Sequence, residues 1–257
     1  MATAPTVDVQ ELETKVKAMY KAVAEHPEGK YHFEMGRPVA ERLGYPGDVL
    51  DLIPEGALES FAGVGYFFDL AELREGETVA DFGSGSGSDV FFAATQVGST
   101  GEVIGIDFTE EQLDKARQLA GAGGFEQVEL REGRIESPPL EDGSVDCVIS
   151  NGVVNLAPDK HRVFAAAARA LRPGGRLALA DIVSDHELKE STRCDADLWA
   201  ACIGGAAQKD DYREAIEAAG LRIEEIRENP YEFISGQALE ASAKYGVRSV
   251  SVLARKE

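Results

Sequence analysis

A glycine-rich turn followed at a distance by a carboxylate is the part of the sequence with the clearest chemical potential. The apolar segment Val79–Phe82 leads into Gly83-Ser84-Gly85-Ser86-Gly87, and glycines let a backbone pass close to a ligand without a side-chain clash. Asp107 lies 20 residues beyond Gly87 and directly follows a second apolar segment. A carboxylate in that position can accept hydrogen bonds from both hydroxyl groups of a ribose. The two features together predict a nucleoside-binding site.

The glycine pattern separates the classes of nucleoside ligand only in part. The spacing GxGxG is complete from Gly83 to Gly87, whereas the GxGxxG spacing of dinucleotide-binding folds fails because Ser88 stands at its last position. A nicotinamide-dependent oxidoreductase stays an alternative that depends on the loop and Asp107 alone. That alternative predicts hydride transfer and no affinity for a sulfonium cofactor.

The elements that would position these residues alternate between short β-branched segments and longer segments of helical periodicity, which is typical of a parallel sheet covered by helices. Seven strands are expected, at Thr78–Phe82, Val103–Ile106, Gln127–Arg131, Val145–Ser150, Arg176–Val183, Arg222–Arg227 and Val247–Ala254. The predicted fold is therefore α/β, with a Rossmann-like, seven-stranded and mostly parallel sheet. Ligands of such sheets bind at the carboxyl ends of the strands.

Local signals predict where two of the helices begin. Thr109 and Gln112 have the spacing of a capping box, and Asp159 is placed to cap a helix that runs to Leu171.

Residues 1–75 differ from the rest and predict a helical N-terminal extension. Their first segment has apolar residues at helical spacing, and aromatic residues concentrate before the sheet begins. Two roles stay open: packing of this extension onto the sheet, or a lid over the site that brings aromatic rings near a substrate. We expect residues 76–257 to form the ligand-binding domain, with an insertion at about 184–210, and both parts to make one compact unit.

Five short motifs follow one another between residues 81 and 175: Asp81–Gly87, Gly105–Asp107, Gly133–Glu136, Ser150–Asn151 and Leu171–Gly175. In this order and spacing they resemble the motifs of class I S-adenosylmethionine-dependent methyltransferases. A narrower resemblance, to the arsenite methyltransferase family, covers most of residues 55–220 through Glu136, Ser150–Leu156, Pro158–Lys160, Ala180–Asp181 and Ala201–Ala206.

The resemblance implies S-adenosylmethionine as cofactor and an antiparallel last strand. It also implies a role for each motif residue. The methionine portion of the cofactor would lie near Asp81, Gly83, Ser84, Gly85 and Gly87, the ribose at Asp107, the adenine at Phe108, Ile135 and Glu136, and the sulfonium end at Ser150 and Asn151.

The sequence departs from the narrower family at the residues that would hold arsenic. That family uses several cysteine thiolates, which suit a soft, thiophilic centre. Here Val64 and Gly152 stand at two of those cysteine positions, and only Cys202 remains. Cys194 would lie about 12 Å from Cys202 if the intervening segment is helical, so the two could not share one ion. We therefore expect an acceptor other than arsenite, and no metal site.

No catalytic residue can be named from the sequence, because methyl transfer from a sulfonium depends mainly on alignment in a water-poor pocket. The residues expected near the acceptor are Tyr66, Asn151, Trp199, Cys202 and His32. Trp199 could wall the pocket or pack the insertion onto the core. Cys202 could bind substrate or be a small apolar side chain.

The leading hypothesis is thus an S-adenosylmethionine-dependent methyltransferase that acts on a small molecule. Its main alternative is a non-catalytic S-adenosylmethionine-binding or regulatory protein, since missing thiols could mean lost activity. The formal charge of −20, from 46 acidic and 26 basic residues in 257, disfavours nucleic acid and anionic membranes as partners. We expect a cytoplasmic protein with reduced cysteines, of which Cys147 belongs to the core. The sequence indicates no oligomeric state.

Overall fold

A twisted sheet organises the computed structural model, which describes residues 8–31, 33–193, 198–199 and 203–257. Its main strands are β1 (Thr78–Phe82), β2 (Glu102–Asp107), β3 (Val128–Glu132), β4 (Val145–Asn151), β5 (Leu171–Ser184), β7 (Leu221–Glu228) and β8 (Arg248–Lys256). They lie in the order β3-β2-β1-β4-β5-β8-β7, and the two-residue strand β6 (Ala207–Gln208) pairs with β5. The strands β1 to β5 are parallel to one another, whereas β8 runs antiparallel to β5 and β7. The predicted Rossmann-like sheet and its antiparallel last strand are confirmed.

Successive side chains of each strand point to opposite faces of the sheet. Both faces are buried, because helices pack against each of them. On β1, Val79 belongs to one apolar cluster, with α6 (Ser88–Val97) and the N-terminal helices. Ala80 belongs to the other, with α8 (Lys160–Ala170) and α11 (Lys209–Ala218). The helix α7 (Glu110–Gly123) follows β2. A parallel sheet buried in this way explains the nearly continuous apolar runs of its central strands.

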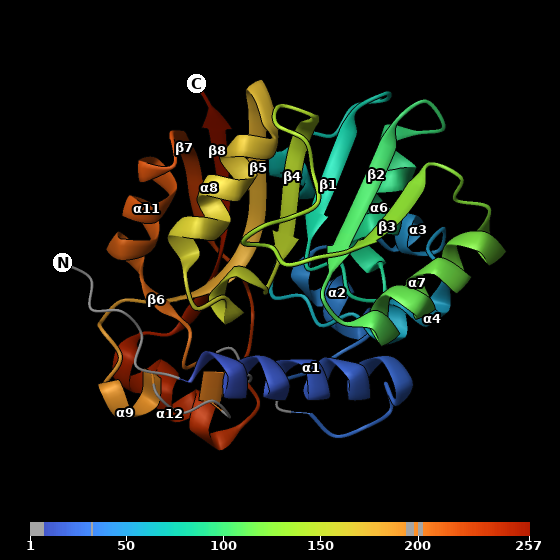
Figure 1. Ribbon diagram of the computed structural model, residues 1–257. Coiled ribbons are helices and arrows are strands. Elements are labelled where there is room, and N and C mark those ends of the chain that lie inside the picture. Colours follow the sequence, from blue (N-terminus) through green and yellow to red (C-terminus); the bar gives the residue numbers. More distant parts are fainter. Residues whose placement is uncertain (1–7, 32, 194–197, 200–202) are drawn as a thin grey trace.

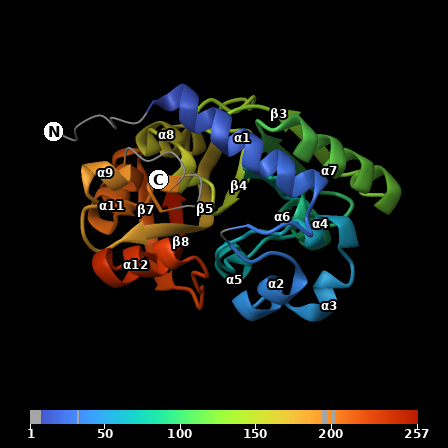
Figure 2. The same ribbon diagram turned by 90° about the horizontal axis from the view of Figure 1, so that it is seen from below.

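The described residues of the N-terminal region form five helices: α1 (Val9–Glu25), α2 (Arg37–Leu43), α3 (Gly47–Leu50), α4 (Glu55–Glu59) and α5 (Phe68–Ala71). Helices α2 to α5 pack on the α6 side of the sheet. Helix α1 lies across the carboxyl ends of the strands (Figure 1), and Figure 2 shows this arrangement from that side. Its Leu12 and Val16 are buried beneath it. The region therefore combines packing against the sheet with a cover over the edge where ligands of this fold bind.

One of the two predicted helix caps is present in the structure and the other is not. The Asp159 carboxylate accepts a hydrogen bond from the backbone nitrogen of Arg162 and caps α8 as predicted. The capping box of Thr109 and Gln112 is wrong, because no side-chain bond caps α7 there. Gln112 instead accepts a hydrogen bond from Ser86 and donates one to the backbone oxygen of Tyr20 in α1. A tertiary contact has replaced the local one.

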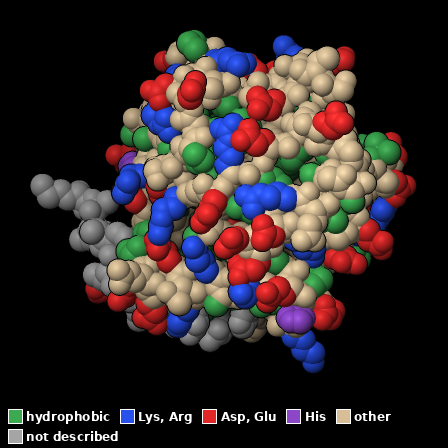
Figure 3. Space-filling view, turned by 45° about the vertical axis from the view of Figure 1, so that its right-hand side comes forward, with side chains coloured by type: hydrophobic (Ala, Val, Ile, Leu, Met, Phe, Trp, Pro, Cys, Tyr) green, Lys and Arg blue, Asp and Glu red, His purple; other side chains and the backbone are tan. Residues whose placement is uncertain are grey.

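The segment between β5 and β7 contains α9 (Glu190–Arg193), Leu198–Trp199, β6 and α11. A further helix, α12 (Gly236–Tyr245), joins β7 to β8. On the face shown in Figure 3, acidic and basic side chains are interspersed. Within the described parts of the chain, no helix is both long enough and apolar enough to cross a bilayer.

Candidate functional site

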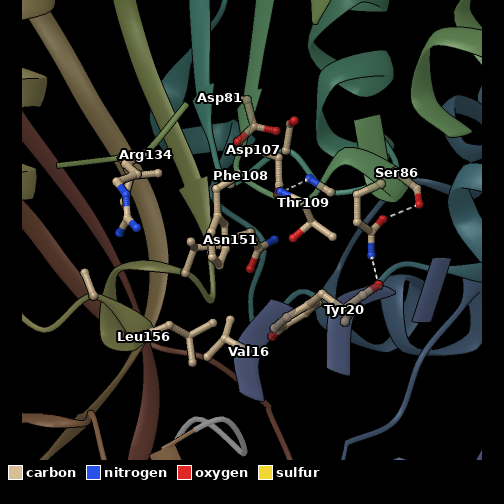
Figure 4. Close-up of a pocket in the computed structure, with 18 of the residues that line it drawn as sticks. Val16, Tyr20, Asp81, Ser86, Asp107, Phe108, Thr109, Arg134, Asn151 and Leu156 are labelled. Atoms are coloured by element: carbon tan, nitrogen blue, oxygen red, sulfur yellow. Dashed lines mark hydrogen bonds between the residues drawn. The ribbon is translucent and has the colours of Figure 1, made fainter. Parts of the chain in front are cut away.

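A pocket opens at the carboxyl ends of β1, β2 and β4, between these strand ends and α1 (Figure 4). Asp81 and Asp107 lie on its sheet side, and Val16 and Tyr20 of α1 close the opposite side. Between them the lining continues through the glycine loop, the segment after β3 and residues on either side of η1 (Val154–Leu156), including its last residue. These are the elements that the sequence motifs predicted to converge.

The glycine loop needs glycine where it turns at the pocket. Gly83 has a φ of +83°, and a Cβ built there would lie 2.5 Å from both γ carbons of Val153. Gly85, with a φ of +51°, lines the pocket as well. Gly87 also has a positive φ but lies outside the lining, where an added Cβ would meet the ring of Phe91. The third glycine of the motif thus serves packing of α6, while the first two serve the pocket.

The hydroxyl group of Ser84 bears on whether this loop suits a polar ligand. Its side chain lines the pocket and its hydroxyl oxygen is buried without a hydrogen-bond partner in the part of the chain that the structure describes. Buried hydroxyls are normally paired, because an unpaired one loses its hydration without compensation. A ligand with polar groups would supply the missing partner, as the nucleoside prediction requires.

Asp107 anchors the loop from the end of β2. Its two carboxylate oxygens accept hydrogen bonds from the backbone nitrogens of Thr109, at 2.8 Å, and Gly85, at 3.0 Å. Burial raises the pKa of this carboxyl, and these backbone donors oppose the shift. Each oxygen keeps lone-pair capacity for a further donor. The carboxylate is therefore held at the pocket with the acceptor capacity that a ribose needs.

Residues predicted to contact an adenine gather on the β2 and β3 side. Phe108, Ile135 and Glu136 all line the pocket. The ring of Phe108 has the Lys17 ammonium of α1 at 5.1 Å from its centroid, and Arg134 forms an ion pair with Glu13 of α1. The covering helix thus contacts the β2 and β3 side of the pocket directly.

Asn151 lines the pocket, but its amide already has partners. Its carbonyl oxygen accepts the backbone nitrogen of Val64 at 2.8 Å, and its amide nitrogen lies within 3.0 to 3.1 Å of Tyr45, Gly65 and Asp89 oxygens. These bonds tie the segment around Val64 to the end of β4. Ser150, the other residue predicted for the sulfonium end, points away from the lining and donates to the backbone oxygen of Phe82.

A further pocket carboxylate, Asp89, was not identified by the sequence analysis. It lies in the first turn of α6 and accepts the Tyr45 hydroxyl at 2.6 Å. Burial raises the pKa of Asp89 to about 6, against the opposing effect of its hydrogen bonds from Tyr45 and Asn151. Burial also raises the pKa of Asp81 well above its usual range, and the nearby Asp89 and Asp107 add to the shift. The only sequence signal was an acidic residue just inside the helix that follows the glycine loop.

Of the residues predicted near the acceptor, Asn151 lines this pocket, whereas Tyr66 and Trp199 do not. Tyr66 belongs to an aromatic cluster, 5.0 Å from the ring of Tyr45, and is not part of the lining. Trp199 is buried, donates to the backbone oxygen of Asn155 at 3.0 Å and packs the insertion against η1, outside the lining. His32 and Cys202 lie outside the described residues. Cys147 is buried in the sheet, as predicted, where burial raises the pKa of its thiol to about 12.

The two positions at which cysteines are missing lie side by side. A Cβ built on Gly152, which has a φ of +71°, would be 3.2 Å from a γ carbon of Val64. Val64 is buried and its backbone nitrogen is bound to Asn151. Apolar carbon therefore occupies the place where the arsenite family, by resemblance, has a pair of thiolates.

Comparison with known proteins supports the same assignment. The model of a methyltransferase domain matches residues 73–220, more than half of the chain. The chain belongs to the S-adenosylmethionine-dependent methyltransferases. The match spans the glycine loop, Asp107 and the strands around them, and the cofactor of this family is S-adenosylmethionine. The family favours methyl transfer over the hydride transfer of the oxidoreductase alternative.

Several relatives of this methyltransferase act on arsenic. An arsenite methyltransferase of Halobacterium salinarum is 41% identical over 84% of this chain and 56% of its own length, and the human one is 37% identical over 53% and 39%. The crystal structure of an arsenic(III) S-adenosylmethionine methyltransferase from Chlamydomonas reinhardtii has a TM-score of 0.64 and 30% identity, covering 86% of this chain and 74% of that one. The chain spans about half the length of the first of these curated relatives.

Proposed function

We propose that this chain transfers the methyl group of S-adenosylmethionine to a small organic acceptor and that arsenite is not that acceptor. The observation that carries the proposal is the contact between the positions of Val64 and Gly152. Arsenic(III) is soft and thiophilic, and selective binding calls for several converging thiolates. An isopropyl group packed beside a glycine offers neither charge nor a lone pair.

The pocket supplies what this kind of reaction asks of a protein. S-adenosylmethionine contributes an electrophilic methyl group on a positively charged sulfur, so the acceptor needs chiefly alignment and exclusion of water. Leu12 and Val16 of α1, with Phe61, Val153 and Leu156, place apolar side chains around the space that the polar loop leaves free. We infer that these residues contact the acceptor and keep water from the reacting atoms.

The nucleoside end is proposed to use the residues predicted from the sequence. Asp107 would accept the ribose hydroxyls, Phe108 would face the adenine ring, and Ile135 with Glu136 would contact its edge. Asp81 and the loop from Gly83 to Gly85 would lie along the methionine portion. Their common position in one pocket supports these roles.

Binding tests the cofactor half of the proposal. Calorimetric titration should show S-adenosylmethionine and S-adenosylhomocysteine binding to the parent chain and no binding of NADH. Asp107→Ala should lower the affinity for both ligands by about tenfold or more, since one hydrogen bond to a charged group contributes about 1.5 kcal/mol or more to the free energy of binding. Asp114→Ala removes an exposed carboxylate on α7 and is the matched control. A parent chain that binds neither sulfur nucleoside overturns the proposal.

Turnover tests the acceptor half. Formation of S-adenosylhomocysteine should be followed with arsenite and with a panel of thiols, phenols and quinones. We expect product with at least one organic acceptor and none above background with arsenite. Methylated arsenic formed at a rate above that of every organic acceptor would refute the proposal.

A further inference from the structure

A row of three buried carboxylates crosses the pocket, and the middle one has no protein partner. Asp107 and Asp89 each accept hydrogen bonds from their surroundings. Asp81 is 2% exposed, lines the pocket, and receives no hydrogen bond or ion pair from any residue that the structure describes. Burying a carboxylate without a counter-charge is costly. The arrangement therefore points to a cationic ligand.

The position of Asp89 assigns it to one end of that ligand. The sheet order β2-β1-β4 places Asp107 on one side of Asp81. Asp89 is hydrogen-bonded to Asn151 at the end of β4, so it lies on the opposite side. Phe108 and the other adenine-facing residues belong to the side of Asp107. A nucleoside seated there directs its remaining part toward Asp81 and Asp89.

The separation of the carboxylates argues for an extended organic cation and against a metal ion. Among the described residues, no three acidic, histidine or cysteine side chains come close enough together to hold one ion. S-adenosylmethionine carries two positive groups, a sulfonium and an ammonium, separated by a short carbon chain, and they outnumber the single carboxylate of its methionine portion. Two neighbouring carboxylates at the methionine end match that pattern of charge.

We propose that Asp89, held by Tyr45 and Asn151, is a cofactor-binding residue that pairs with Asp81 as counter-charge to the cationic methionine end of S-adenosylmethionine. The inference rests on the proposed function, because it assumes that this cofactor occupies the pocket. Its location in the first turn of α6 offsets part of the cost of burying the carboxylate, since the N-terminus of a helix favours negative charge. The Tyr45 hydroxyl fixes its direction through the 2.6 Å hydrogen bond.

The test compares ligands that differ in charge at one end. S-adenosylmethionine has the sulfonium and the ammonium, S-adenosylhomocysteine has only the ammonium, and 5′-methylthioadenosine has neither. Asp89→Asn should weaken S-adenosylmethionine by about ten- to a hundredfold, as expected for loss of a charge a few ångströms away in a partly buried site. The affinity for S-adenosylhomocysteine should fall by a smaller factor, and the affinity for methylthioadenosine should fall by less than about threefold.

Tyr45→Phe controls for disruption of the network, because it removes a hydrogen bond to Asp89 but leaves its charge. It should change the affinities of S-adenosylmethionine and methylthioadenosine by the same factor. Equal losses for both ligands in Asp89→Asn would overturn the assignment of Asp89, and so would an unchanged affinity for S-adenosylmethionine. A parent chain that binds none of the three nucleosides would instead refute the proposed function. The outcomes are thus distinguishable.

Discussion

Restoring the missing thiols gives the most direct test of why this chain would not use arsenite. The double substitution Val64→Cys and Gly152→Cys should create a site for trivalent arsenic, because the two side chains would start from neighbouring positions. Replacing the branched valine by cysteine also removes one γ carbon and leaves room for the new side chain at 152. The parent chain should bind phenylarsine oxide weakly or not at all.

The magnitudes follow from the local geometry. Gly152 has a φ of +71°, and a residue with a Cβ in this conformation costs about 1 to 2 kcal/mol. In a chain of this size that cost lowers Tm by about 2 to 8 °C. Two thiols on one arsenic should tighten binding by about a hundredfold or more over a single thiol, because the second bond forms within the molecule.

The assay can use the intrinsic fluorescence of Trp199, the only tryptophan of the chain. Its indole donates to the backbone oxygen of Asn155, whose amide in turn donates to the backbone oxygen of Gly152. Titration with phenylarsine oxide under reducing conditions should change this signal in the double-cysteine variant. Val64→Ala with Gly152→Ala carries the same backbone strain without thiols and is the matched control.

Two results would refute the reasoning. If the parent chain binds phenylarsine oxide as tightly as the double-cysteine variant, the absent thiols do not determine the acceptor. If a folded double-cysteine variant binds no better than the double-alanine control, positions 64 and 152 do not form a joint site. Retained unfolding cooperativity in both variants establishes that they are folded.

Three further predictions concern the pocket and the core. Gly83→Ala should lower the free energy of unfolding by about 2 kcal/mol or more, because the new Cβ is strained and meets Val153. It should also abolish the thermal shift caused by S-adenosylmethionine, whereas the control Gly121→Ala, where a Cβ meets no other atom, should have neither effect. The affinity for S-adenosylmethionine should fall about tenfold from pH 7 to pH 5, since Asp89, with a pKa of about 6, must lose its proton to pair with a cation. Calorimetry in two buffers should detect proton release near pH 6, and an affinity that does not change with pH would contradict this prediction. Cys147 should resist alkylation in the native protein at pH 8, because it is buried and its thiol has a pKa of about 12; labelling followed by peptide mass analysis would reveal any modification.

Much of the pocket around the glycine loop and Asp107 could be predicted because its signals are local. The glycine loop, the strand before it and Asp107 are each recognisable from a few neighbouring residues. The rule that ligands bind at the carboxyl ends of parallel strands then brings them together. All seven expected strands occur, and only the start of β5 lies well before its prediction, at Leu171 instead of Arg176. There the pairing with β4 is irregular, and the segment with two glycines continues the strand.

The other end of the pocket could not be predicted, because its partners are distant in sequence. Asp89 is held by Tyr45, 44 residues away, and Asn151 bonds to that same tyrosine across 106 residues. Trp199 and Tyr66 looked suited to a pocket by type, but packing directs them elsewhere. Nothing in the spacing of these residues encodes the direction of a side chain.

The sequence by itself thus determined the sheet, the glycine turn, the position of Asp107 after its strand and the absence of cysteine at positions 64 and 152. These depend on hydrophobic periodicity, backbone conformation and residue identity, which are properties of short segments. Only the tertiary structure decided that Val64 lies against Gly152, that α1 covers the pocket, and that Asp81, Asp89 and Asp107 share it. Burial raises the pKa of all three carboxyls, the neighbouring carboxyls add to the shift at Asp81, and hydrogen bonds oppose it at Asp89 and Asp107. These effects depend on elements that meet only when the chain has folded.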